Sequence, residues 1–162
     1  MIVVSDTTAI STLYLIGQLS WLEALFGRVL IPKSVYAELL ELESAGHDLG
    51  PIHEANWLLV EEVLDQKLVN KLQQELDRGE SEAIALAIQT NADYLLIDER
   101  KGNKKATELG VETVGLLRVL LALKSKNIID SVKPILDKIQ QEGGFWMNQA
   151  LYNRVLKAAD EA

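Results

Sequence analysis

The chain has 162 residues, of which 48% are hydrophobic and 25% charged, so its composition is that of a folded globular domain and excludes a disordered chain. It contains no Cys, which excludes disulfides, zinc sites with thiolate ligands and Cys nucleophiles, and its two His residues are too few for a three-His metal site. The net charge of −8 argues against a broad basic surface for nucleic acid. It is compatible with an acidic pocket that concentrates divalent cations.

The N-terminus begins directly with the strand-like run Met1-Ile2-Val3-Val4, and no basic stretch followed by an apolar one precedes it. The longest apolar runs, such as residues 119–123, are far shorter than the ~20 residues that span a bilayer. We therefore expect a soluble, cytoplasmic protein.

Short apolar runs alternate along the chain with segments of helical periodicity. In chain order the pattern predicts a strand at residues 2–5, helices at 8–16 and 19–26, a strand at 29–31, helices at 34–42 and 51–55, a strand at 57–63, helices at 66–76 and 80–90, a strand at 94–97, a helix at 101–109, a strand at 111–114, and helix from 116 to 162 with breaks near 127–130 and at Gly143-Gly144. This alternation predicts an α/β fold with a parallel central sheet flanked by helices. Ligands of such sheets bind beyond the carboxyl ends of the strands.

Acidic residues stand at the ends of two of these predicted strands. Asp6 follows the first strand directly, and Asp98 follows the strand at residues 94–97. If both strands are parallel members of one sheet, both carboxylates leave the same edge. Glu38 lies in the helix after the second strand and is the mid-helix acid of the same pattern.

Two further acids, Glu80 and Glu82, open the helix predicted at residues 80–90. Ile84, Ala87 and Ile88 define one apolar face of this helix, and Glu80 lies one turn before Ile84 on that face. Glu82 points roughly the other way. A carboxylate on the inward face of a helix start either caps the helix or points into a site.

Carboxylates that gather at one sheet edge repel each other unless a cation lies among them. Mg²⁺ or Mn²⁺ takes oxygen ligands, lowers the pKa of a bound water and holds a phosphate oxygen, which is the chemistry of many nucleases. Structural roles stand beside this interpretation. Asp6 and Asp98 can cap the helices that follow them, Glu38 can be a surface residue, and the helix dipole favours Glu80 and Glu82 whatever their function.

Four segments of the sequence together resemble the motifs of PIN-domain proteins. They are Val3-Val4-Ser5-Asp6-Thr7-Thr8, Ile31-Pro32-Lys33-Ser34-Val35-Tyr36-Ala37-Glu38, Gly79-Glu80-Ser81-Glu82-Ala83, and Ile97-Asp98-Glu99-Arg100-Lys101-Gly102. The last two strings are similar to those of a group of prokaryotic PIN-like proteins related to VapC-type toxins. The likeness runs from Met1 to about Leu123, and the segment from Gly144 to Leu156 resembles the usual ending of that group.

The resemblance implies a PIN fold with an acidic cleft that binds Mg²⁺ or Mn²⁺, and ribonuclease activity on single-stranded RNA. Asp6, Glu38 and Asp98 match the first, second and fourth acidic positions. The third is ambiguous between Glu80 and Glu82, and the position of Glu80 on the inward face favours Glu80. Many PIN nucleases have Asp at the third position and Thr-x-Asp at the fourth motif, whereas this chain has Glu at the third and the run Ile97-Asp98-Glu99 at the fourth. Either Asp98 or Glu99 is therefore the fourth acid. These departures concern the activity more than the fold.

The candidate RNA contacts lie beside the acids. One basic cluster follows Asp98, and Thr7 follows Asp6; the hydroxyl of Thr7 can bind a phosphate or a metal-bound water, or it can cap the next helix. The cluster can contact RNA phosphates or can be a solvated helix face. It consists of Arg100, Lys101, Lys104 and Lys105.

These observations predict a PIN-like nuclease domain at residues 1–125 and a helical extension at 126–162 that packs on it. The predicted protein is a metal-dependent endoribonuclease and a candidate toxin of a toxin–antitoxin pair, with an antitoxin protein as a further partner. The apolar helices between residues 13 and 25 favour either the core or a homodimer interface. The alternative from another class is an inactive PIN-like module that binds nucleic acid or protein. A phosphatase of the haloacid dehalogenase type needs a second Asp two residues after its nucleophile, and Thr8 stands at that place.

Overall fold

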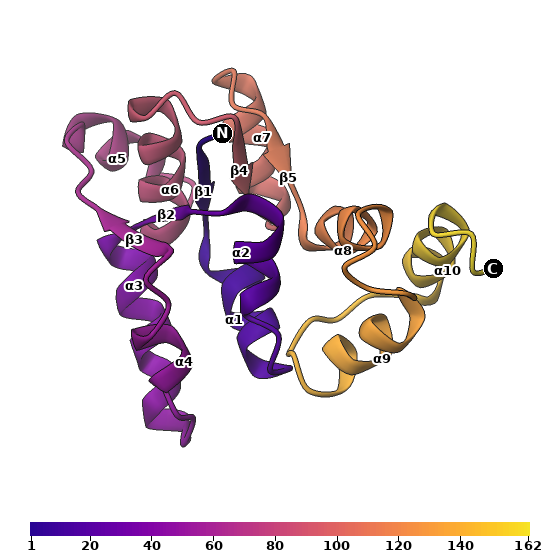
Figure 1. Ribbon diagram of the computed structural model, residues 1–162. Coiled ribbons are helices and arrows are strands. Elements are labelled where there is room, and N and C mark those ends of the chain that lie inside the picture. Colours follow the sequence, from indigo (N-terminus) through magenta and orange to yellow (C-terminus); the bar gives the residue numbers. More distant parts are fainter.

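The computed structural model describes residues 1–162, and a single five-stranded sheet runs through it (Figure 1). Its strands are β1 (Val3–Ser5), β2 (Val29–Pro32), β3 (Leu58–Glu61), β4 (Tyr94–Leu96) and β5 (Thr113–Val114). All neighbouring strands are parallel, and their spatial order is β3-β2-β1-β4-β5. The predicted α/β class with a parallel central sheet is therefore confirmed.

Helices connect the strands and make up the whole C-terminal part. They are α1 (Thr7–Leu15), α2 (Ser20–Phe26), α3 (Lys33–Leu40), the 3₁₀ turn η1 (Glu41–Ala45), α4 (Gly50–His53), α5 (Gln66–Leu72), α6 (Arg78–Gln89), α7 (Arg100–Glu108), α8 (Leu116–Ser125), α9 (Lys133–Gln141) and α10 (Gln149–Ala158). Every predicted helix is present within a few residues, and the C-terminal part divides at the two predicted breaks. The helix expected to reach residue 76 ends at Leu72, because residues 73–76 turn toward the start of α6. None of the helices combines the length and the apolarity that crossing a bilayer requires.

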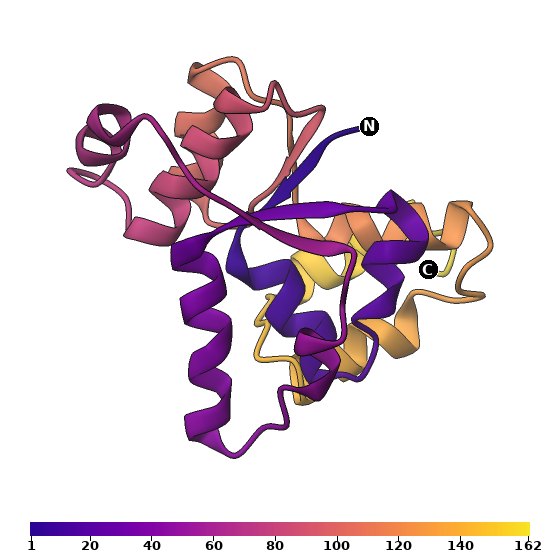
Figure 2. The same cartoon turned by 60° about the vertical axis from the view of Figure 1, so that its left-hand side comes forward.

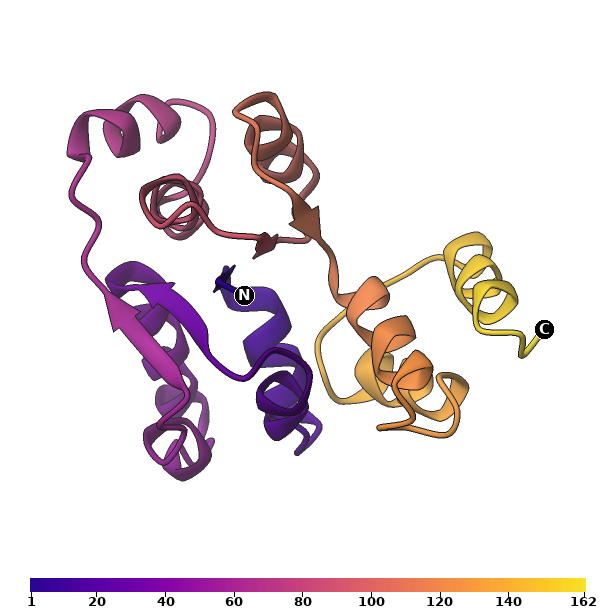
Figure 3. The same cartoon turned by 45° about the horizontal axis from the view of Figure 1, so that its top comes forward.

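The sheet separates two apolar cores, because successive side chains of a strand point to opposite faces. Val4 of β1 and Leu95 of β4 belong to the core shared with α5, α6 and α7. Val3 and Leu96 belong to the larger core, which includes residues of α1, α2, α3 and α8. Figures 2 and 3 show these two groups of helices on opposite faces of the sheet.

The C-terminal helices α8, α9 and α10 lie together beside the sheet (Figure 1). Leu136 and Ile139 of α9 and Val155 and Leu156 of α10 belong to the same buried cluster as residues of α1 and α8. The residues after 126 therefore share the main core.

The apolar residues between 13 and 25 are mostly used for this core. Leu13, Ile16, Leu19 and Leu22 are buried in it, and Leu25 packs against it. This packing supports the core interpretation of these helices. The homodimer stays a prediction.

Candidate functional site

The strand order changes direction at β1, which lies between β2 and β4 although β4 comes far later in the chain. Such a switch point is where parallel α/β sheets bind ligands. Ser5 of β1 is in register with Leu96 of β4, and the Asp6 N–H donates to the Leu96 carbonyl at 2.9 Å. Asp6 and Asp98 thus leave the sheet from neighbouring strands at the same edge, as the sequence pattern predicts.

Asp6 and Glu38 converge on the first turn of α6. Asp6 is only 7% exposed. A Cβ placed on Gly79 would overlap Glu38 Oε1 and would lie 3.6 Å from Asp6 Oδ1. The Thr7 hydroxyl donates to Glu38 Oε2 at 2.6 Å, so Thr7 holds the second acid in place.

Burial raises the pKa of Asp6 from 3.8 to about 7, although a hydrogen bond from the Thr7 backbone partly lowers it. The carboxylates of Glu38, Asp77 and Asp98 raise it further. Burial also raises the pKa of Glu38, against the lowering effect of the Thr7 hydroxyl. The negative charges of Asp6 and Glu38 are therefore only partly compensated by the groups around them.

Glu80 enters the same region from α6. Its Oε2 is buried without a hydrogen-bond partner, and a Cβ on Gly102 of α7 would lie 2.8 Å from that atom. Burial raises the pKa of Glu80 from 4.5 to about 8. A hydrogen bond with the side chain of Asp77 and the charges of Asp77, Asp6 and Glu99 add to the rise.

Glu82 is also buried, but its carboxylate lies on another side of α6. Its Oε1 accepts a hydrogen bond from the Ser34 backbone N–H at 3.2 Å, and its Oε2 lies 3.3 Å from Arg78 Nε. The charge of Asp6 therefore acts on Glu80, whereas the carboxylate of Glu82 is held by Ser34 and Arg78. The expected apolar face of this helix is only partly correct, because Ile88 is 41% exposed while the helix is buried on all sides from Gly79 to Ala87.

Asp98 and Glu99 occupy different positions at the end of β4. Both oxygens of Asp98 accept from the Leu116 backbone N–H, at 3.0 and 3.2 Å, so Asp98 caps α8 rather than α7. Burial raises the pKa of Asp98, and this hydrogen bond lowers it in part. Glu99 is exposed and stands immediately before α7, where its charge acts on Glu80.

Asp77 is a site residue that the sequence reasoning missed. Its Oδ1 accepts from the Glu80 backbone N–H at 2.8 Å and caps α6, and its charge acts on Asp6, Glu38 and Glu80. The signal was present, because Asp three residues before Glu at a helix start is typical of a capping arrangement. The helix begins at Arg78, two residues earlier than predicted, which places Asp77 at its cap.

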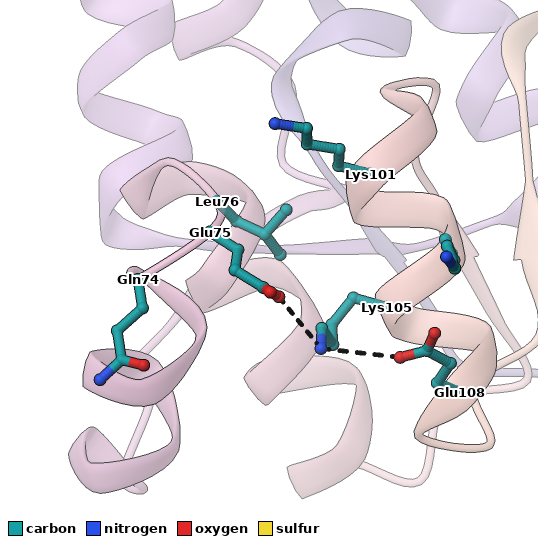
Figure 4. A pocket seen from close by; sticks show the side chains of 7 residues that line it. Gln74, Glu75, Leu76, Lys101, Lys105 and Glu108 are labelled. Atoms are coloured by element: carbon teal, nitrogen blue, oxygen red, sulfur yellow. Dashed lines mark ion pairs between the residues drawn. The ribbon is translucent and has the colours of Figure 1, made fainter.

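The basic residues after Asp98 all lie on α7. Arg100, Lys101 and Lys104 are exposed and take part in none of the ion pairs of the structure. Lys105 Nζ lies 3.1 Å from Glu75 Oε2 and 3.6 Å from Glu108 Oε2, as Figure 4 shows. These three residues line a cavity of about 410 Å³ together with Lys101 and Lys104.

The acidic cluster of Asp6, Glu38, Asp77, Glu80 and Asp98 contains no cationic side chain. None of the five forms an ion pair with Lys, Arg or His. No three acidic or His side chains are arranged so that they hold one ion by themselves. The donors fit a hard divalent cation that takes one or two carboxylates and completes its shell with water, and the unpartnered Glu80 Oε2 is one free ligand atom of that kind.

Comparisons with known proteins agree with this architecture. A PilT N-terminus domain protein of the hyperthermophilic archaeon Sulfolobus solfataricus has a similar structure, with a TM-score of 0.52 over 74% of this chain and 90% of that chain, at 21% sequence identity. This similarity concerns the fold alone. No curated protein matches the sequence.

A family model described as a PIN domain matches residues 2–161, almost the whole chain. PIN domains are generally nucleases that use divalent metals. The resemblance of the four sequence motifs is therefore confirmed. The chain belongs to the PIN-domain family.

Proposed function

We propose that the protein is a metal-dependent endoribonuclease that cleaves single-stranded RNA with Mg²⁺ or Mn²⁺. The observation that carries the proposal is the acidic cluster at the switch point of the sheet, in which Asp6 and Glu80 are buried and no acid has a cationic partner. Burial raises the pKa values of Asp6 and Glu80 to about 7 and about 8, so their charged forms need a compensating cation. The strings shared with VapC-type proteins support RNA as the substrate.

Asp6 and Glu80 are the residues that would hold the metal directly, because they are the most buried of these acids and the charge of Asp6 raises the pKa of Glu80. Glu38 and Asp98 would bind its waters or a second ion. A divalent cation at this place lowers the pKa of water and stabilises charge on the phosphodiester.

The other residues of the site position these carboxylates. Thr7 fixes Glu38 through its hydroxyl, the Leu116 N–H fixes Asp98, and Asp77 fixes the start of α6, from which Glu80 projects. Thr7 was expected to contact RNA. Its hydroxyl donates to Glu38, so we propose that it acts through that carboxylate.

The test is cleavage of a fluorescent single-stranded RNA with Mg²⁺, with Mn²⁺ and with EDTA. We expect cleavage with either metal and none with EDTA. Asp6→Asn and Glu80→Gln remove the charge of one ligand each and keep its size, so both variants lose cleavage. Asp160→Asn is the matched control, since Asp160 is exposed in the last turn of the chain and lies outside the acidic cluster.

Two outcomes contradict the proposal. Equal cleavage by the wild type and the two variants means that a contaminating enzyme is responsible. Binding of RNA without cleavage under any metal condition favours the inactive binding module instead. Thermal unfolding with Mn²⁺ separates these cases, because an ion held by Asp6 and Glu80 raises the melting temperature of the wild type only.

We extend the proposal to a toxin that an antitoxin protein restrains. Induced expression of the wild type should then arrest growth of the host cell, and expression of Asp6→Asn should not. Growth that is unaffected by an active wild-type nuclease contradicts the toxin role and leaves the nuclease in place. The predicted homodimer is tested by light scattering of the pure protein.

A further inference from the structure

A groove runs along α7 away from the acidic cluster and begins at Asp98. It has a volume of about 650 Å³, and no hydrophobic residue lines it. Its lining residues are Asp98, Arg100, Asn103, Lys104, Thr107 and Glu108. The groove therefore joins one acid of the candidate site to the basic helix.

The two charged side chains of the groove that have no partner within the protein are both cationic. Arg100 and Lys104 are exposed, form no ion pair and stand four residues apart on α7, which corresponds to a rise of about 6 Å. This rise is comparable to the separation of neighbouring phosphates in an extended strand. Asp98 lies at the end near the cluster, and Glu108 is engaged by Lys105.

The two neutral side chains of the groove have partners within the protein. Asn103 Nδ2 donates to Thr113 Oγ1 at 3.0 Å, and Thr107 Oγ1 donates to the Asn103 carbonyl at 2.9 Å. No aromatic ring lines the groove, so it offers no platform on which a base can stack. The groups that remain to bind a ligand are therefore the cations of Arg100 and Lys104.

We propose that this groove binds two successive phosphates of the substrate strand, next to the linkage that is cut, through Arg100 and Lys104. It grips the backbone and does not read the bases. The inference rests on the proposed nuclease function. It places the path of the RNA strand on the side of the acidic cluster where α7 lies. Lys105 has no part in this grip, because Glu75 and Glu108 already compensate its charge.

The test is binding of a fluorescent oligouridine in EDTA, where no cleavage occurs, measured by anisotropy over a series of salt concentrations. For a single strand the logarithm of the affinity falls with the logarithm of the salt concentration by about 0.7 for each phosphate that is neutralised. Arg100→Gln and Lys104→Gln should each reduce this slope by about 0.7, and the double variant by about 1.4. The control is Lys157→Gln, an exposed lysine of α10 without an ion pair, which should keep the wild-type slope.

Two further measurements complete the test. With oligoadenosine and oligocytidine, the two variants should show the same reduction of the salt-dependence slope, because the groove makes no contact with the bases. Neutral methylphosphonate linkages placed one at a time along the strand should weaken binding at two adjacent positions on one side of the cut. An unchanged slope in Arg100→Gln and Lys104→Gln, or a loss confined to one base, overturns the inference.

The inference and the proposed function fail separately. If the wild type cleaves RNA and the slopes of the variants do not change, the proposal that the groove binds phosphates is wrong and the proposed nuclease function is retained. If the slopes change as expected and no metal supports cleavage, the groove binds a strand and the nuclease proposal fails.

Discussion

Three glycines make room for the acids of the site. Gly79, Gly102 and Gly115 have ordinary negative φ angles, so a turn does not require them. A Cβ at Gly79 would overlap Glu38 Oε1, one at Gly102 would lie 2.8 Å from Glu80 Oε2, and one at Gly115 would lie 3.0 Å from Asp98 Oδ1. Each glycine is thus matched to a different carboxylate.

Gly102→Ala tests this relation. Alanine normally stabilises a helix by about 1 kcal/mol relative to glycine. Here the added methyl group meets Glu80 Oε2 and Ile97 Cδ1, so we expect the free energy of unfolding to fall by about 1–3 kcal/mol. A carboxylate displaced by about 1 Å also costs about 100-fold in cleavage rate. Urea denaturation and the RNA assay measure the two effects.

Gly50→Ala is the matched control for this substitution. A Cβ at Gly50 would meet only the side chain of Asp48, which is exposed and able to move. We expect its stability and cleavage to stay at the wild-type level. Equal stability of Gly102→Ala and Gly50→Ala would show that the space beside Glu80 is not limiting.

The raised pKa of Asp6 makes the metal-free protein less stable as pH rises. The unfolded chain releases this proton near 3.8 and the folded protein only at about 7, so stability falls as pH rises between these values. Asp6→Asn has no such proton. At pH 8 in EDTA we expect the variant to be more stable than the wild type by roughly 2–4 kcal/mol, with a smaller difference at pH 5. Urea denaturation at both pH values measures this, and parallel pH curves for the two proteins would contradict it.

At the scale of elements, Glu161 ties the end of the chain to the helices α8 and α9. It accepts hydrogen bonds from Ser131 Oγ at 2.6 Å, from the backbone N–H groups of Val132 and Lys133 at 2.8 and 3.0 Å, and from Lys124 Nζ at 3.0 Å. These donors outweigh the effect of burial and lower the pKa of Glu161 from 4.5 to about 2. Glu161, which follows α10, therefore fixes the C-terminal end of the chain to the rest of the fold.

Glu161→Gln should destabilise the protein at neutral pH by about 2 kcal/mol, because charged hydrogen bonds become neutral ones. The stabilisation by Glu161 is complete above pH 4.5 and disappears as pH falls toward 2, so the difference between the two proteins should shrink in that range. Thermal unfolding at pH 7 and pH 3 measures it. Asp160→Asn, one residue earlier and exposed, should show no such pH dependence, and if it does the anchor is not specific to Glu161.

The sequence predicted the elements better than their depth in the fold. Hydrophobic periodicity located every strand and α-helix but not the 3₁₀ turn η1, and the rule on strand ends brought Asp6 and Asp98 together correctly. The sequence pattern could not show that α6 is buried on all sides, because this burial depends on α3, α5 and α7, which pack around α6. Glu82 is for this reason a buried partner of Ser34 and Arg78, which no local pattern indicates. Asp77 was missed because the predicted helix started two residues late.

At the scale of the whole molecule, the spatial order of strands is what creates the site. Residues 6, 38, 80 and 98 are far apart in sequence, and they meet because β4 pairs with β1 rather than with β3. The alternation of strands and helices predicts a parallel sheet but not its order. The clustering of the acids therefore depends on long-range pairing.

The C-terminal helices are part of this whole, which a truncation tests. Deleting residues 144–162 removes Met147, Val155, Leu156 and Ala159 from the main core and removes Glu161 from α9. We expect the truncated chain to lose cooperative unfolding, measured by circular dichroism against urea. A truncated chain that unfolds as sharply as the full one would mean that residues 1–143 form an independent domain.

The glycine spaces also matter for judging other chains of this family. In a relative that has all four acids, alanine or a larger residue at the place of Gly79, Gly102 or Gly115 would require the neighbouring carboxylate to shift. A comparison of the acids alone would not reveal this difference. A comparison of the site between members of the family therefore has to include these three glycine positions as well as the four acidic ones.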